Sequence, residues 1–437
     1  MDLLRPFANS EEASCLNRGS SLRLQMAHWH ILMNPDTAPL TRYLESQLPG
    51  TLKWLQRLVR VNSFTMNRQG VNHVVTLTEE MFASLGFISE RVPSENADYG
   101  DHLFLSRQGK GKRNPVVLVT HSDTVFPGAE ELRENFIWKE EGDRIYGPGT
   151  VDNKGGTALI WLMLHGLRET APEVFDSTHW IIAANASEEV TASDFGRLTR
   201  QRCPDGAHVV LVFEGGIRSG NDYQIVVARK GRAEFVVQSV GRAAHAGSNL
   251  HEGVNAIVSL SRCIEPMAAL TDPGQEVTLN IATIHGGTVL NRVPHEAELA
   301  FEMRAYEPTV LDQAKAQVVE ILRKLNPPDG SLTLQCNGRT PAWPSDDSTH
   351  GLSRYWQTAA EELGLTISPT KRGGLSDANY LAGLGPMLDG MGPSGGNAHC
   401  SERNPDADKW PEFVDPQSFA PKAAINVLAL LKALPLT

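Results

Sequence analysis

The chain has 437 residues, of which 41% are hydrophobic and 21% are charged. This length predicts two or three domains with a sizeable core, and the composition excludes a mostly disordered chain, a collagen-like fibre and a disulfide-stapled miniprotein. Acidic residues outnumber basic ones by 51 to 40, for a formal net charge of −11, so a nucleic-acid partner is not expected.

The cysteines and the apolar runs bear on location. The five cysteines are widely spread and form no Cys-x-x-Cys pair, which favours a reducing compartment over a disulfide framework or a zinc ribbon. No run approaches the roughly 20 apolar residues that a membrane span needs, and polar residues 9–12 interrupt any signal-peptide core. We therefore expect a soluble, cytoplasmic protein with no membrane partner.

The first part of the chain predicts a parallel sheet covered by helices. Residues 1–36 are polar and irregular, and are expected to form an extension. Leucines from Leu44 to Leu58 recur at helical spacing, and Pro49-Gly50 is expected to split that helix in two. Further helices are predicted over 71–85 and 153–168, and buried strands over 116–120, 179–184 and 209–213. Strands alternating with helices indicate an α/β sheet with helices on both faces.

The pattern changes near residue 229. Strands are predicted over 233–240, 277–284 and 296–304, with helices over 254–267 and 310–325 and a last strand over 331–335. This β-α-β-β-α order is typical of a small two-layer α+β sandwich. From 344 the chain is α/β again and ends in a helix over 421–434. The predicted organisation is an extension (1–36), a first part of the large domain (37–228), an inserted domain (229–343) and a second part of the large domain (344–437).

Acids and histidines follow the predicted strands of the large domain. His121 and Asp123 come directly after the VVLVT strand, Glu188 and Glu189 follow HWIIAA, and Glu214 follows VVLVF. In open α/β sheets, sites form beyond the carboxyl ends of the strands. The turn GPGTVDNKGG adds one more acid just before a helix, Asp152.

This set of side chains predicts a metal site. Zinc accepts imidazole nitrogen and carboxylate oxygen, and two zinc ions a few ångströms apart need a bridging carboxylate. Taken singly, His-x-Asp is more often a surface pair, Glu-Glu a solvated helix start, and Asp152 a helix N-cap. Their recurrence at successive strand ends favours the metal site.

Together these motifs resemble a known family. HSDTV from His121, GPGTVDNKGG from Gly147 and SEE from Ser187 are similar to the signatures of the dizinc metallopeptidases. That family includes glutamate carboxypeptidase, acetylornithine deacetylase, succinyl-diaminopimelate desuccinylase and aminoacylase. The stretches GGLSDANY from Gly373 and LDGMGPSGGNAH from Leu388 are closest to glutamate carboxypeptidases, and the resemblance covers about residues 40–434.

The resemblance implies a zinc-exopeptidase-like catalytic domain that holds two zinc ions per subunit, with Co²⁺ or Mn²⁺ as alternatives. Asp152 would bridge the two ions and Asp123 would orient the ring of His121. Glu188 would be the general base that takes a proton from the metal-bridging water. The implied ligands are His121, Asp152 and Glu214 for one ion, and Asp152, Glu189 and His399 for the other.

The resemblance also implies residues that contact the substrate. His245 would reach the site of a partner subunit and stabilise the oxyanion, which requires a homodimer, and the inserted domain would serve as dimerisation and lid domain. Asn291 would contact the substrate, and Gly374 lies where the family backbone approaches it. Arg339 would bind a substrate carboxylate, since a planar guanidinium suits bidentate carboxylate binding.

The expected activity is hydrolysis of the amide bond of N-acyl amino acids or small peptides that carry a free carboxylate, in the manner of a glutamate carboxypeptidase. An acetylornithine deacetylase-like, desuccinylase-like or aminoacylase-type deacylase is an alternative. A further alternative is an inactive dimerising module, although Glu188 and all five ligand positions carry competent residue types. A serine hydrolase would need a Gly-x-Ser-x-Gly elbow between strand and helix, and none is found in that setting.

Overall fold

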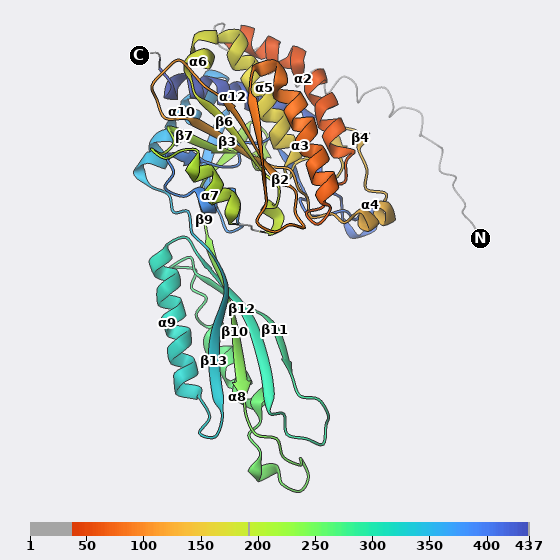
Figure 1. Ribbon diagram of the computed structural model, residues 1–437, viewed down its shortest axis with the longest axis vertical. Coiled ribbons are helices and arrows are strands. Elements are labelled where there is room, and N and C mark those ends of the chain that lie inside the picture. The colour runs from red at the N-terminus through yellow and green to blue at the C-terminus, as the bar shows by residue number, and fades with distance from the viewer. Residues whose placement is uncertain (1–36, 191–192, 436–437) are drawn as a thin grey trace, which may run out of the picture.

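The computed structural model describes residues 37–190 and 193–435 of the chain. These residues form a large domain and a slender small domain that projects from one side of it (Figure 1). The predicted extension 1–36 lies outside the described residues.

A six-stranded mixed sheet forms the centre of the large domain, in the order β1-β2-β6-β3-β7-β15. The strands β6, β3, β7 and β15 are parallel, while β1 and β2 add an antiparallel edge. The predicted strands at 116–120, 179–184 and 209–213 are confirmed as three adjacent members, with Val116 paired to Trp180 and to Val209. The bounds are β1 (Ile88–Pro93), β2 (Asp101–Arg107), β3 (Val116–His121), β6 (Trp180–Asn185), β7 (Val209–Val212) and β15 (Met387–Leu388).

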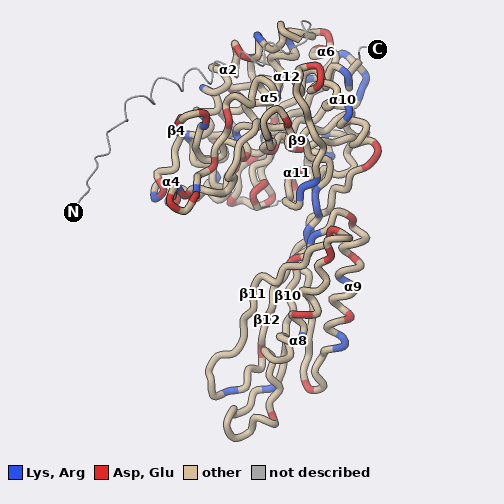
Figure 2. Tube along the Cα trace, turned by 180° about the vertical axis from the view of Figure 1, so that it is seen from behind, with Lys and Arg blue, Asp and Glu red and all other residues tan. Residues whose placement is uncertain are grey.

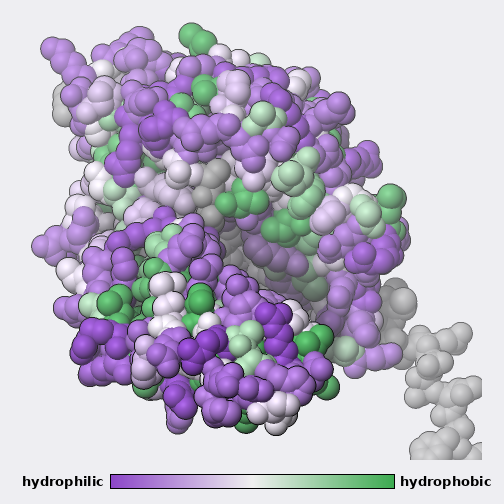
Figure 3. Space-filling model, turned by 60° about the horizontal axis from the view of Figure 1, so that its bottom comes forward, coloured by the Kyte–Doolittle hydropathy of each residue, from purple (hydrophilic) through white to green (hydrophobic). Residues whose placement is uncertain are grey.

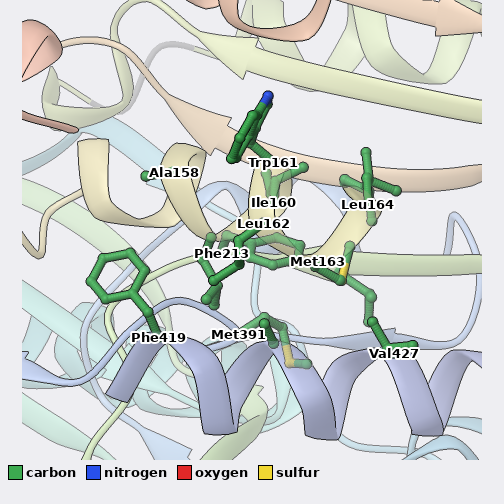
Figure 4. Packing of buried hydrophobic residues seen from close by; sticks show 14 of the residues in the cluster. Ala158, Ile160, Trp161, Leu162, Met163, Leu164, Phe213, Met391, Phe419 and Val427 are labelled. Carbon is green, nitrogen blue, oxygen red and sulfur yellow. The ribbon is translucent and has the colours of Figure 1, made fainter. Parts of the chain in front are cut away.

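Helices cover both faces of this sheet, as the sequence predicts. One face carries the main core, in which Leu162 and Met163 of α5 lie over Met391, Phe419 and Val427 (Figure 4). The opposite face packs against α7 and α11. The helices of this domain are α2 (Ala38–Val59), α3 (Arg68–Phe82), α4 (Gly128–Glu134), α5 (Lys154–Thr170), α6 (Pro172–Ser177), α7 (Asp194–Gln201), α10 (Asp347–Glu362), α11 (Asp377–Leu381) and α12 (Phe419–Ala433).

The expected break at Pro49-Gly50 is wrong, because α2 runs unbroken from Ala38 to Val59 with Pro49 inside it. Leu44 lies before the proline and Leu55 and Leu58 lie after it, and all three are fully buried. Packing of this apolar face across the proline outweighs the local cost of the ring, as tertiary contacts commonly outweigh propensity.

Two small sheets frame the large domain. One has the order β14-β9-β8 and the other β16-β17-β5-β4. Several of these strands have only two or three residues. Their bounds are β4 (Lys139–Glu141), β5 (Arg144–Tyr146), β8 (Arg218–Ser219), β9 (Asp222–Arg229), β14 (Thr366–Arg372), β16 (Gly395–Gly396) and β17 (Phe413–Val414).

The small domain is a two-layer sandwich, as its element order predicts. Its sheet has the order β11-β12-β10-β13, and two helices pack on one face around a separate apolar core. The elements are β10 (Gly231–Val240), α8 (Ala256–Ala268), β11 (Thr278–Gly286), β12 (Glu296–Ala305), α9 (Pro308–Leu325) and β13 (Ser331–Thr340).

The chain enters the small domain between the end of β9 at Arg229 and the start of β10 at Gly231, and leaves it after β13. The Asn379 side chain donates to the carbonyl oxygens of Lys230 and Pro341, so it holds both crossing segments. Lysine and arginine residues gather at this junction (Figure 2). The boundaries at 228/229 and 343/344 stay predictions.

Two expectations about location can be compared with the structure. Within residues 37–190 and 193–435, no helix combines the length and apolarity that crossing a membrane requires. The four cysteines in the same part of the chain, Cys203, Cys263, Cys336 and Cys400, are free thiols.

Candidate metal centre

The sheet delivers acids and a histidine to one edge. His121 is the last residue of β3, Glu188 and Glu189 begin a single 3-10 turn just beyond β6, and Glu214 lies two residues beyond β7. Asp152 lies just before α5, and its peptide bond to Asn153 is cis. His399 comes from the C-terminal part of the chain, in a loop after β16.

These side chains form two clusters that share Asp152. His121, Asp152 and Glu214 make one cluster, and Asp152, Glu189 and His399 the other, with ligand atoms within 4.8 Å of one another in each. The Nε2 atom of His121 lies 3.0 Å from Oδ1 of Asp152, while Nε2 of His399 lies 3.3 Å from Oδ2. Each oxygen of the Asp152 carboxylate therefore faces a different cluster, which is the arrangement a bridging ligand requires.

Asp123 holds several residues of this edge of the sheet in place through its carboxylate. Its carboxylate lies 3.3 Å from Nδ1 of His121 and accepts a hydrogen bond from the hydroxyl of Thr65. The same carboxylate accepts the backbone N–H groups of Glu188 and Glu189, each at 3.2 Å. The 3-10 turn and these two bonds allow neighbouring glutamates to point into one site, although neighbours in an extended strand would diverge.

The two histidines and Asp152 stabilise one another's charged forms. Burial alone would lower the pKa of His121, but hydrogen bonds to Asp123 and Asp152 raise it well above its usual range. Hydrogen bonds to Asp152 and Glu189 raise the pKa of His399 to about 10. Burial opposes the ionisation of Asp152, yet hydrogen bonds from both histidines hold its pKa well below the usual range.

The remaining carboxyl groups resist ionisation together. Burial raises the pKa of Glu214 to about 8 and that of Glu189 to about 7, and the charge of Asp152 adds to both effects. Burial also raises the pKa of Glu188 well above its usual range, and His121 offsets only part of the increase. The buried carboxyl groups outnumber the two imidazoles, so the site would carry an excess of negative charge if all of them were ionised.

The donor set fits a pair of divalent cations. Each cluster offers one imidazole nitrogen and two carboxylate oxygens, which are ligand types that zinc prefers and that cobalt and manganese also accept. Three protein ligands per ion leave a position open, as catalytic rather than structural zinc sites do.

Gly374 lies in a loop that joins this edge of the sheet. Its carbonyl accepts a hydrogen bond from the guanidinium of Arg229, which also pairs with buried Asp389. A few residues on, Asp377 accepts a hydrogen bond from Asn185 at the end of β6, and burial raises the pKa of Asp377 to about 7. The loop is therefore fastened to the sheet beside the metal-ligand clusters.

His245 and Asn291 lie together but far from these clusters in the same chain. They occupy facing loops, with a backbone bridge between His245 and Arg292 and a hydrogen bond from the N–H of Ala246 to the carbonyl of Asn291. Both loops lie at the free end of the small domain, beyond the ten residues of β10, which span about 30 Å. Figure 3, in which the free end of the small domain is turned toward the viewer, shows a recess between the small domain and the large one behind it.

Arg339 forms an ion pair within the small domain rather than with the metal-ligand clusters. It lies in β13, where its guanidinium makes an exposed ion pair of 2.8 Å with Asp312 of α9. The predicted strand over 331–335 is confirmed but extends to Thr340, so Arg339 belongs to an edge strand.

Sequence reasoning missed Glu412 and assigned no role to Asp377 or Arg229. Asp377 lies in the GGLSDANY stretch that carries the family resemblance, so a signal for it existed. Glu412 accepts hydrogen bonds from the backbone of Asp152, and nothing in its local sequence marks it.

Comparison with known proteins agrees with this fold. Residues 227–330 match the peptidase dimerisation domain of the M20 family. Carboxypeptidase G2 of Pseudomonas sp. (strain RS-16) is 28% identical over 357 residues, covering 81% of this chain and 84% of that protein. Acetylornithine deacetylase of Pectobacterium carotovorum is 28% identical over 302 residues, covering 65% and 75%.

Solved structures share the fold. The aminopeptidase PepT of Bacillus cereus has a TM-score of 0.72 at 21% identity and covers 92% of this chain and 99% of that one. The YXEP protein of Bacillus subtilis, described as a dinuclear metal binding peptidase from the M20 family, has a TM-score of 0.63 at 13% identity and covers 89% and 99%.

An α/β sheet with acids and a histidine at its strand ends, together with an inserted dimerisation domain, defines a metallopeptidase or related amidohydrolase. Within that class, residues 227–330 match the M20 peptidase dimerisation domain, and the chain is similar to carboxypeptidase G2 and to acetylornithine deacetylase.

Proposed function

We propose that this enzyme is a carboxypeptidase-type exopeptidase that cleaves the amide bond of N-acyl amino acids or small peptides carrying a free carboxylate. The observation that carries the proposal is the pair of ligand clusters that share Asp152, with the carboxyl group of Glu188 buried beside them. The similarity to carboxypeptidase G2 favours a glutamate-type substrate.

The metal proposed for both clusters is zinc, with Co²⁺ or Mn²⁺ as alternatives. His121 and Glu214 would hold one ion, Glu189 and His399 the other, and Asp152 both. Such a pair would act as a Lewis acid toward the scissile carbonyl and make water nucleophilic near neutral pH. The dinuclear metal site of the Bacillus subtilis neighbour supports two ions rather than one.

Glu188 is the proposed general base. Its backbone N–H is held by Asp123, and its carboxylate would take the proton from the attacking water and pass it to the leaving nitrogen. Bound dications would favour the ionised form that a base needs, because they supply the positive charge that this group of carboxylates lacks.

His245 is the proposed donor to the oxyanion, acting from a partner subunit. Its Nδ1 accepts hydrogen bonds from the N–H groups of Gly247 and Ser248, both at 3.1 Å, so the neutral ring carries its proton on Nε2. An N–H donor fixed in this way suits a developing oxyanion. Asn291 would contact the substrate from the neighbouring loop, and Gly374 would line the site from the large domain.

Arg339 remains the proposed ligand of the substrate carboxylate. Its ion pair with Asp312 is exposed on both sides, and exposed pairs of this kind are worth only about 0–1 kcal/mol. A substrate carboxylate could therefore compete for this guanidinium when the two domains close.

The chemical alternative is a deacylase of the acetylornithine deacetylase, desuccinylase or aminoacylase type, which the similarity to acetylornithine deacetylase supports. Both functions would use the same base and ligands and differ only in what holds the substrate. The non-enzymatic alternative, a dimerising module, is less well supported because the base and five ligands are all of competent types.

The test is release of free amino acid from a panel of N-acyl amino acids and dipeptides, with and without a zinc chelator. We expect glutamate-terminal substrates to be cleaved best, with activity lost to the chelator and restored by added zinc. Best cleavage of acetylornithine or a succinylated amine would favour the deacylase instead. Full activity in the chelated, metal-free protein would contradict the proposal.

A further inference from the structure

Glu412 lies between two segments that bring ligands to the metal centre. It directly precedes β17, which pairs with β5 on one side and β16 on the other. The chain runs from β5 to Asp152 within six residues, and from β16 to His399 within three. The residue just before the middle strand therefore adjoins the segments of two candidate ligands, Asp152 and His399, that are 247 positions apart in the sequence.

The contacts of Glu412 reach both segments. Its Oε1 atom accepts the backbone N–H of Asp152 at 3.1 Å and that of Val151 at 2.9 Å. Its own backbone N–H donates to the carbonyl of Cys400 at 2.7 Å, one residue after His399. The side chain holds the bridging aspartate while the main chain holds the loop of the second histidine.

The burial of the Glu412 carboxyl group indicates that this side chain does more than fill space in the core. Glu412 is fully buried, and its Oε2 atom has no hydrogen-bond partner among the described residues. Burying a carboxyl group with an unpaired oxygen is costly, whereas an apolar side chain of similar size would fill the space without that cost. The other oxygen, Oε1, accepts hydrogen bonds from the backbone at Asp152, the proposed bridging residue, and at Val151.

His399 needs such support. Its side chain is 56% exposed, and its backbone has a φ of 66°, in the left-handed region that few residues other than glycine adopt readily. More than half of this side chain is exposed, so the position of its ring depends on the contacts of Nε2 with Asp152 and Glu189 and on the hydrogen bonds of its loop.

We propose that Glu412 is a positioning residue of the metal centre, which fixes the carboxylate of Asp152 and the loop of His399 relative to each other. The inference rests on the proposed two-metal site and adds to it a residue that touches neither the ions nor the substrate. Loss of such supporting partners typically lowers metal affinity about 10–100-fold.

The experiment is a zinc titration of the metal-free full-length protein by calorimetry, for the wild type, E412A, E412Q and the control E402A. Glu402 lies in the same loop but is exposed and paired with Lys409. We expect E412A to bind the weaker zinc at least about tenfold less tightly. E412Q, whose amide oxygen can still accept the two N–H groups, should lie between E412A and the wild type, and E402A should match the wild type.

Circular dichroism and thermal unfolding of the metal-free proteins separate positioning from stability. Wild-type zinc affinity in E412A, even with a lower melting temperature, would overturn the inference and leave the metal centre standing. If E412A does not fold, E412Q decides, and wild-type affinity in E412Q would overturn the inference. A wild-type protein that binds no zinc would overturn the proposed function and the inference together.

Discussion

Glu188 and Glu189 are neighbours in the sequence with different expected duties. Both backbone N–H groups donate to the carboxylate of Asp123, but only Glu189 lies within a ligand cluster. Substitution of each by glutamine, which keeps the size and removes the charge, can therefore separate catalysis from metal binding at adjacent positions.

We expect E188Q to keep two bound zinc ions and an unchanged KM while kcat falls roughly 10²–10⁴-fold, the usual contribution of a general base. E189Q should lose zinc as well as activity. Metal analysis after dialysis and steady-state kinetics check both variants. A kcat for E188Q within a few fold of the wild type would remove Glu188 from the role of base.

Single residues were predictable from sequence where they follow a recognisable element. His121, Glu188, Glu189 and Glu214 follow three buried strands that are adjacent in the sheet, so the strand-end rule placed them at one edge. Glu412 could not be found in this way, because the partners of its side chain lie about 260 positions away and the strand that follows it has two residues. The ion pair of Arg339 with Asp312 depends on a tertiary contact that spacing does not reveal.

Helix α12 contributes apolar side chains to the core and also buries a lysine, whose charged form is destabilised there. Ten of its side chains are buried, and Lys422 among them is fully buried. Its Nζ atom donates to the carbonyl of Gln224. Burial lowers the pKa of Lys422 to about 7, and the charge of Arg372 adds to the effect.

The sign of the resulting pH dependence follows from proton binding. Between about pH 7 and pH 10.5 the unfolded chain holds a proton on Lys422 that the folded chain does not, so this residue makes the protein more stable as pH rises. We expect K422M to flatten the rise in the free energy of unfolding over this interval by up to about 1.4 kcal/mol per pH unit. Urea unfolding at several pH values measures the difference.

Lys432 provides the matched control, since it lies in the same helix but is partly exposed and paired with Glu362. K432M should leave the pH slope unchanged. A K422M slope equal to that of the wild type would show that the folded protein keeps Lys422 protonated throughout the interval.

At the scale of elements, long segments with a clear hydrophobic period were predictable. Very short strands, and elements whose extent is decided by packing against other parts of the chain, were not. The helices at 71–85 and 153–168 and the strands of the small domain are confirmed. The two- and three-residue strands of the outer sheets are too short to show a period. The break at Pro49 is wrong because packing on both sides of the proline holds α2 together.

In the molecule as a whole, the proposed metal ligands lie far from two of the residues proposed to contact the substrate. The ligand clusters lie in the large domain, while His245 and Asn291 lie at the far tip of the small one. Beside Asn291, Val289 is 57% exposed and Leu290 is fully exposed. Exposed apolar side chains next to candidate site residues favour a covered, dimeric state of this tip.

A mixture of two inactive variants tests whether sites are shared between subunits. E188Q and H245A should each be nearly inactive alone, because every site lacks either the base or the oxyanion donor. After subunit exchange, a mixed dimer should regain one site with both residues intact, so a one-to-one mixture should recover activity at about one site in four. Absence of recovery despite mixed dimers, verified with two affinity tags, would place His245 outside the partner's site.

The overall fold class was predictable from the sequence, since alternating strands and helices interrupted by a β-α-β-β-α unit leave few other arrangements. How the small domain projects from the large one was not predictable. That direction is set by contacts such as the hydrogen bonds of Asn379 to Lys230 and Pro341, which join segments from three parts of the chain.

The division of the ligands between distant segments has a consequence for biosynthesis. His121, Asp152 and Glu214 all precede the inserted domain, whereas His399 and Glu412 follow it. At 5–20 residues per second, a ribosome needs roughly 10–40 s to pass from Glu214 to His399. For that time a nascent chain holds four of the five candidate ligands, Asp152 and Glu189 of the second cluster among them, and lacks only His399. The proposed two-metal site can therefore be completed only as the last tenth of the protein is made.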